Sequence, residues 1–309
     1  MTVDPGAGQP LRLLTYLAPS VPATLFTALA DHVGGELGCD VEVSYDSSRS
    51  GPRPGEREPF TTGEADVAFL CATSYVWLTG TAHPPIRLVG AAWAPTDPRA
   101  DQQAVYFGDV LVRVDGPAQL GDLIGRRVAY NDDASLSGYH SVRLALREAG
   151  IDAEGVRFVR SGSHLRSLEL LVEGDVDAAA IDSTVWHRLS RRTPALAAQV
   201  RPIAALGPHP VQPVVARAGL PTHVRDGVRD ALLGAHEAPA TARALAAAEL
   251  RRFVPVDDAH YRPLAARMTA LDVGWPHAGD DGARLRPSDS DACGATPPPR
   301  RRRGARPRR

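Results

Sequence analysis

Residues 120–150 read LGDLIGRRVAYNDDASLSGYHSVRLALREAG, and this stretch decides the fold. A short run at residues 128–131 predicts a strand, and the apolar spacing over residues 135–149 predicts a helix that Gly150 closes. The polar residues NDDASLSG lie between the two, with Ser135 and Ser137 where the helix should begin. A strand that leads through a short polar turn into a helix is the repeating unit of a parallel α/β sheet.

The same alternation continues in both directions from this stretch. Toward the N-terminus, strands are predicted at residues 11–17, 41–45, 66–70, 87–92 and 104–114, with helices at 22–37 and from Ser74 onward. Toward the C-terminus, strands are predicted at 156–160, 178–182, 200–206 and 211–216, with helices at 164–173, 184–189, 221–234, 239–250 and 258–271. Residues 47–59 are rich in Ser, Gly and Pro and predict a loop. The chain is therefore expected to be an α/β protein.

Composition limits the kinds of partner that the chain can have. Its 309 residues are 43% apolar and 23% charged, which is enough for two domains with separate cores. The formal net charge of −1 includes seven Arg within residues 300–309, so residues 1–299 carry about −8. Such an acidic body argues against nucleic acid as a partner. Residues 1–10 are predicted to be flexible, and the Arg- and Pro-rich residues 276–309 are predicted to be disordered.

The cysteines and the N-terminus bear on cofactors and on location. Cys39, Cys71 and Cys293 are widely spaced and form no CxxC motif, so we expect no disulfide framework, no metal site and no other cofactor. The sequence MTVDPGAGQP has no basic segment followed by an apolar one, and no run of 18 apolar residues occurs. We expect a cytoplasmic protein as the chain is written, or an extracytoplasmic one if an upstream leader is missing.

The start of the helix at Ser135 is a candidate anion site. The first turn of a helix carries free N–H groups and a partial positive charge, and the Ser135 and Ser137 hydroxyls add further donors. Gly138 would let a ligand approach the backbone closely. Serine and aspartate are also ordinary helix N-caps, and this second interpretation stays open on the local pattern alone.

Several segments resemble one known family. They are GEADVAFLCATSYV (63–76), VYFGDVLVR (105–113), LGDLIGRRVAYNDDASLSGY (120–139), SGSH (161–164), GDVDAAAIDS (174–183) and HPVQPVVA (209–216). Together they resemble the substrate-binding proteins of phosphonate, phosphite and phosphate ABC transporters, over roughly residues 11–255. The D-x-x-S-x-S-G-Y element is the most specific of these segments.

This resemblance implies the two-lobe fold of type II periplasmic binding proteins, with a ligand in the cleft between the lobes. Residues 11–105 plus 212–273 would form one lobe, and residues 106–211 the other. The strands at 104–114 and 211–216 would cross between the lobes. The implied function is the capture of a small oxyanion by a monomer that serves an ABC permease, without catalysis.

The resemblance also implies which residues contact the ligand. Ser135, Leu136, Ser137 and Gly138 match the anion loop, His164 a histidine that faces the ligand oxygens, Tyr106 and Tyr75 cleft aromatics, and Asp182 a carboxylate that accepts from a protonated ligand oxygen. Threonine is common where this chain has Leu136, and Asp133 adds a carboxylate that disfavours a dianion. We expect His164 to make binding depend on pH between about 5 and 8.

Each assignment has a simpler structural alternative. Asp182 and His164 could serve as helix N-caps without contacting a ligand. Tyr106 and Tyr75 could serve as packing residues without contacting a ligand. The positions that hold amine-binding carboxylates in relatives are Thr184 and Gln212 here, which argues against an amine-bearing ligand. Two rival functions also remain. One is an enzyme on the same fold, with Ser135 or Ser137 as nucleophile and His164 as base. The other is a cytosolic ligand sensor.

Overall fold

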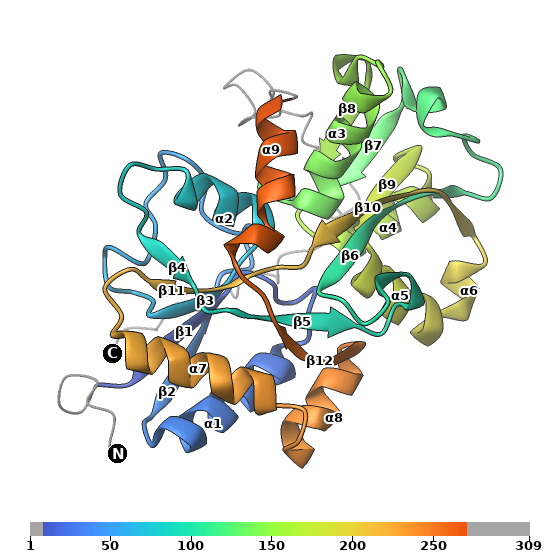
Figure 1. Cartoon of the computed structure of the whole chain (residues 1–309). Helices are drawn as coiled ribbons and strands as arrows, with labels where there is room; N and C mark the ends of the chain where they lie inside the picture. Colours follow the sequence, from blue (N-terminus) through green and yellow to red (C-terminus); the bar gives the residue numbers. More distant parts are fainter. Residues whose placement is uncertain (1–8, 271–309) are drawn as a thin grey trace, which may run out of the picture.

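The computed structural model describes residues 9–270, and its strands form two five-stranded sheets and one two-stranded sheet (Figure 1). This arrangement confirms the predicted α/β class. Of residues 1–10, which were predicted to be flexible, residues 1–8 lie outside the described residues, and so do the predicted tail at 276–309 and Cys293.

The first sheet combines strands from both ends of the described chain. It contains, in spatial order, β2 (Val41–Tyr45), β1 (Leu11–Thr15), β3 (Val67–Phe69), β11 (Val214–Arg217) and β4 (Ile86–Leu88). Strand β1 is parallel to β2 and β3, whereas β11 is antiparallel to β3 and β4. Helices α1 (Ala23–Leu37), α2 (Ala72–Thr79), α7 (Thr222–Gly234), α8 (Pro239–Ala247) and α9 (Arg262–Ala270) belong with this sheet. We call this unit the first lobe.

The second sheet is built from the middle of the chain. It contains, in spatial order, β10 (Val200–Pro210), β6 (Val105–Arg113), β9 (Ala178–Asp182), β7 (Arg127–Tyr130) and β8 (Arg157–Arg160). Strands β7, β8 and β9 are parallel, as the strand–helix alternation predicts. Its helices are α3 (Ser141–Glu148), α4 (His164–Glu173), α5 (Ser183–Arg192) and α6 (Pro194–Ala197). We call this unit the second lobe.

Burial of the second sheet on both faces explains its continuous apolar strands. Successive side chains of a strand point to opposite faces, so Ala179 and Ile181 of β9 join one core cluster and Ala178 and Ala180 join another. The first cluster also contains residues of α4, and the second contains residues of α3. The sheet therefore holds the carboxyl ends of β7 and β9 rigidly at one edge.

Two short segments connect the lobes. The chain passes from β5 (Ala91–Pro95), which pairs with β12 (Leu250–Pro255), through residues 96–104 into β6, and it returns through residues 211–213 into β11. The N–H of Val211 donates to the carbonyl of Ala104 at 3.0 Å, so the two segments lie side by side. The strands expected at 104–114 and 211–216 correspond to β6 and β11, which both begin next to these connecting segments. Strand β6 belongs only to the second sheet, and strand β11 belongs only to the first.

Candidate functional site

A small cavity lies between the two lobes. Its volume is about 50 Å³, and a single water needs about 10–15 Å³ on the same scale. The cavity therefore suits a ligand of a few heavy atoms. Its lining consists of Tyr16, Leu17, Ser20, Val21, Ser50, Cys71, Trp93, Gln212 and Leu250 from the first lobe, and of Tyr106, Asn131, Ser135, Ser137, His164, Asp182, Thr184, Val185 and Arg188 from the second.

Five of the residues that the sequence singles out come together in this lining. Tyr106, Ser135, Ser137, His164 and Asp182 all face the cavity, although they stand on four separate segments of the second lobe. The parallel strands β7 and β9 end at the same sheet edge, and the residues that follow them enter the site there. Ligand contact by these five side chains stays a prediction.

The helix that was predicted from Ser135 begins with a π-helical turn, Leu136–His140, before α3. Ser135 is its N-cap: the Ser135 hydroxyl accepts a hydrogen bond from the Gly138 N–H at 3.1 Å, and the Ser135 carbonyl accepts one from the His140 N–H at 3.1 Å. π-helical turns are rare and often accompany functional sites. The turn directs the Ser137 side chain toward the cavity.

Leu136 and Gly138 do not line the cavity. The backbone N–H of Leu136 donates to the Cys71 sulfur of the first lobe at 3.3 Å, so this N–H is already used. A Cβ added to Gly138 would lie 1.9 Å from Oδ1 of Asn131, which shows that the glycine makes room for the Asn131 side chain. The close approach of a ligand to Gly138 stays a prediction.

Tyr75 lies away from the cavity, on helix α2. Its hydroxyl donates to a carboxylate oxygen of Asp258, and its ring packs against Tyr261 with 4.7 Å between the ring centroids. The structure thus places this side chain in a contact between α2 and the segment that precedes α9.

Tyr106 presents a neutral hydroxyl to the site. The side chain is buried, and burial raises the pKa of its phenol well above the ordinary value. The hydroxyl and N–H of Ser137 interact with the phenol oxygen, and these interactions lower the pKa of the phenol. Tyr106 and Ser137 therefore form a pair of hydrogen-bond groups on one wall of the cavity.

His164 is neutral near physiological pH, contrary to the expected titration between pH 5 and 8. Burial lowers the pKa of its imidazole to about 4, and a hydrogen bond to the Ala180 carbonyl only partly offsets this effect. Its Nδ1 has no hydrogen-bond partner among the described residues. In a neutral imidazole one nitrogen donates and the other accepts, so His164 can meet a ligand oxygen in either role.

Asp182 is both a helix cap and a cavity residue. Its Oδ1 accepts from the Thr184 N–H at 2.8 Å and caps α5, while its Oδ2 accepts from Nε2 of Gln212 in the first lobe at 2.8 Å. Burial raises the pKa of this carboxyl group to about 6. Its charge therefore changes within the physiological range.

Arg188 was not predicted from the sequence and is the only Arg or Lys in the lining. It lies on α5, four residues after Thr184, which also lines the cavity. That i, i+4 spacing puts the two side chains on one face of the helix and is the sequence signal that could have identified it. Ser50 was also missed, because it belongs to a loop without periodicity.

Ser50 joins the lobes at the rim of the cavity. Its N–H donates to Oδ1 of Asp132 at 3.1 Å, and its hydroxyl donates to Oδ2 of the same residue. Arg53 forms an ion pair with Asp133 at 3.0 Å, which compensates the carboxylate that was expected to disfavour a dianion. These contacts therefore connect the two lobes beside the cavity.

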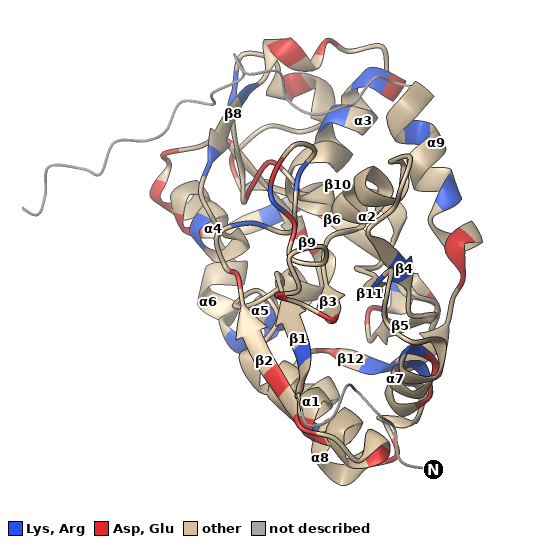
Figure 2. Cartoon of the chain, turned by 90° about the vertical axis from the view of Figure 1, so that its left-hand side faces the viewer, with Lys and Arg blue, Asp and Glu red and all other residues tan. Residues whose placement is uncertain are grey.

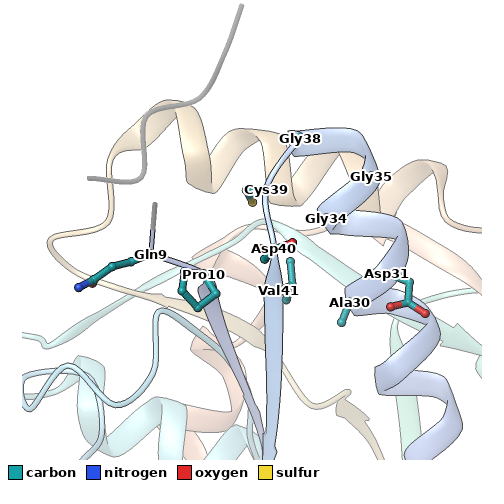
Figure 3. Close-up of a pocket in the computed structure, with 10 residues that line it drawn as sticks. All are labelled: Gln9, Pro10, Ala30, Asp31, Gly34, Gly35, Gly38, Cys39, Asp40 and Val41. Atoms are coloured by element: carbon teal, nitrogen blue, oxygen red, sulfur yellow. The ribbon is translucent and has the colours of Figure 1, made fainter. Parts of the chain in front are cut away.

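A wider hollow of about 730 Å³ lies at the far end of the first lobe, between the end of α1 and the start of β2 (Figure 3). Asp31 and Asp40 are its charged side chains. Two carboxylates without a cation repel anions, so this hollow does not suit the chemistry that the sequence predicts.

The described residues set further limits. They include no helix long and apolar enough to cross a membrane and no cluster of three potential metal ligands. In Figure 2 the basic and acidic residues are interspersed along the ribbon.

Comparison with solved structures identifies the fold. A binding-protein component of an ABC phosphonate transporter from Pseudomonas aeruginosa is 16% identical, with a TM-score of 0.70 over 85% of this chain and 87% of that one. PhnD1 from Prochlorococcus marinus, in complex with methylphosphonate, is 16% identical, with a TM-score of 0.70 over 85% and 98%. The aliphatic sulphonate binding protein of Escherichia coli is 15% identical, with a TM-score of 0.58 over 87% and 94%. The predicted two-lobe fold of type II periplasmic binding proteins is confirmed.

The sequence itself decides the family. Residues 13–261 match the family described as the periplasmic substrate-binding protein of phosphonate ABC transporters. This family consists of transport proteins without catalytic activity, and the match covers most of the chain, including every residue that lines the cavity between the lobes. The chain therefore belongs to the phosphonate substrate-binding proteins of ABC transporters.

Proposed function

We propose that the chain captures a small oxyanion of the phosphonate, phosphite or phosphate class in the cavity between its lobes, for delivery to an ABC-type importer. The observation that carries this proposal is the size and lining of the cavity. The cavity has a volume of about 50 Å³, and Ser135, Ser137 and Tyr106 line it. The two serines stand at the start of a helix, where backbone N–H groups also favour an anion. Hydroxyl donors that converge on a small cavity favour an oxyanion.

The substituent on the ligand is proposed to lack an amine. Thr184 and Gln212, which stand where some relatives carry amine-binding carboxylates, both line the cavity. Gln212 donates its amide to Asp182, so that carboxylate already has a partner. The methylphosphonate in the structure of PhnD1 supports a ligand of this size.

The enzyme alternative finds no support in the site. A serine nucleophile needs a base within hydrogen-bond reach. Among the described residues, no hydrogen bond joins His164 to Ser135 or Ser137, and the Ser135 hydroxyl accepts from Gly138 instead.

A thermal-shift screen tests the proposed ligand class. Phosphate, phosphite, methylphosphonate, longer alkylphosphonates and methanesulfonate would be compared with a neutral sugar and an amino acid. A ligand at about 100 times its Kd stabilises the folded state by roughly 2.7 kcal/mol, so a true ligand raises the melting temperature clearly. A response to the sugar or the amino acid, with none to any oxyanion, would overturn the proposal.

Affinity for the anion is expected to fall as the pH rises through about 6. Burial raises the pKa of Asp182 to about 6, so the carboxyl group is neutral below that pH and repels an anion above it. One coupled proton changes affinity by at most about tenfold per pH unit. Calorimetry from pH 5 to 8 on the parent and on Asp182→Asn measures the effect.

The Asp182→Asn variant is the control for titration of the ligand itself. Asparagine also caps helices, so α5 should persist. Subtracting the pH profile of the variant from that of the parent isolates Asp182, and the variant should bind more tightly than the parent at pH 8. Parallel profiles in the two proteins would refute this role.

A further inference from the structure

Arg188 is a nearly buried cation that the proposed capture of an oxyanion by Ser135 and Ser137 does not use. It projects from α5 and lines the cavity, with 9% of the residue exposed. Positive charges are rarely buried unless a negative charge or several hydrogen bonds compensate them.

Arg188 has only a weak partner in the described part of the chain. Its Nη2 donates to the carbonyl of Ser20 at 2.5 Å, which uses one of the five N–H donors of the guanidinium. No carboxylate among the described residues lies within 4.0 Å of it. The two acids that influence it electrostatically, Asp182 and Glu249, already have partners: Asp182 holds Thr184 and Gln212, and Glu249 pairs with Arg191.

Arg188 enters the cavity from a different element than the serines do. Ser135 and Ser137 follow β7, whereas Arg188 lies on α5, which follows β9. Apolar side chains such as Leu17 and Val185 line the same cavity and can pack against a short carbon linker. A guanidinium fork matches a carboxylate with two parallel hydrogen bonds.

We propose that Arg188 binds a second acidic group on the ligand, so that the preferred solute is a short phosphonate whose carbon substituent ends in a carboxylate. This inference rests on the proposed function, because it assumes that the phosphonate end occupies the serine wall. Arg188 is then the residue that determines specificity for the substituent.

Calorimetry with two ligands of equal size tests the inference. Phosphonoacetate and phosphonoacetamide have the same number of heavy atoms and differ in one negative charge. The parent protein should prefer phosphonoacetate by about 10- to 150-fold, the range for a hydrogen bond to a charged group. This comparison needs no variant, so it does not depend on the folding of a substituted protein.

Two variants then assign the preference to Arg188. Arg188→Gln should abolish the preference, since it removes the charge and keeps a shorter polar side chain. Arg192→Gln removes the same charge one turn later on α5, where the exposed Arg192 touches the Ala247 carbonyl outside the cavity, and it should keep the preference.

The outcomes separate this inference from the proposed function. If methylphosphonate binds the parent but phosphonoacetate is not preferred over its amide, Arg188 only holds the Ser20 carbonyl and the inference fails alone. A preference that survives Arg188→Gln overturns it equally. If no phosphonate binds the parent at all, the proposed function fails and the inference fails with it.

Discussion

Ser137→Ala is expected to lower affinity for the captured oxyanion by about 10- to 150-fold while the protein stays folded. Ser137 lines the cavity, and its hydroxyl and N–H already interact with the oxygen of Tyr106. Removing a hydroxyl that donates to a charged acceptor costs roughly 1.5–3 kcal/mol of binding free energy. Calorimetric titration with the ligand found by screening, together with the melting temperature of each protein, measures both effects.

Ser141→Ala is the matched control for this prediction. Ser141 is also a buried serine, one turn further along the helix, but its hydroxyl donates to the Ser137 carbonyl at 2.8 Å and it does not line the cavity. Its loss should leave affinity close to that of the parent. If Ser137→Ala bound the oxyanion as tightly as the parent does, Ser137 would belong to an ordinary helix start and not to the binding site.

Ser135→Ala should combine a loss of affinity with a loss of stability. Its hydroxyl lines the cavity and also caps the helix by accepting from Gly138. A lost cap costs about 1 kcal/mol of folding free energy, a cost that Ser137→Ala should not show.

Gly138→Ala is expected to destabilise the protein and to abolish tight binding. The new Cβ would stand 1.9 Å from Oδ1 of Asn131 and 3.1 Å from the Ser135 hydroxyl, so one of these side chains must move. Overpacking of this kind costs about 1–3 kcal/mol, which exceeds the helix propensity that alanine gains over glycine. The displaced groups line the cavity, so affinity should fall with stability.

Gly35→Ala is the control for the glycine substitution. Gly35 is an exposed residue of α1, and a Cβ there would meet nothing within 4 Å. Helix propensity alone then favours alanine by about 1 kcal/mol, so this variant should be at least as stable as the parent. Urea unfolding compares the three proteins, and a Gly138→Ala variant that is as stable and binds as tightly as the parent would contradict the packing described here.

The strand–helix alternation predicted the α/β class, and the family resemblance predicted the two-lobe fold. The apolar run that ends at Asp182 and the polar turn before Ser135 each mark the end of a parallel strand, and parallel strands bring such ends together. The family resemblance singled out Ser137, Tyr106 and His164, and the structure places all three in the lining of one cavity.

Other features depend on contacts that local patterns do not encode. The Ser50 clamp on Asp132 joins residues 82 positions apart, and the low pKa of His164 follows from burial by the assembled lobes. The need for a glycine at position 138, where the Asn131 side chain occupies the space of a Cβ, also depends on such a contact. Tyr75 could not be placed because helical spacing does not show which neighbour an aromatic ring meets.

A crystal structure of the protein with its tightest-binding oxyanion tests the central claim most directly. We predict that the anion lies in the cavity between the lobes, with its oxygens within hydrogen-bond distance of the Ser137 hydroxyl and N–H and close to the Tyr106 hydroxyl. An anion bound elsewhere, for example in the hollow between α1 and β2, with the inter-lobe cavity empty, would contradict the account.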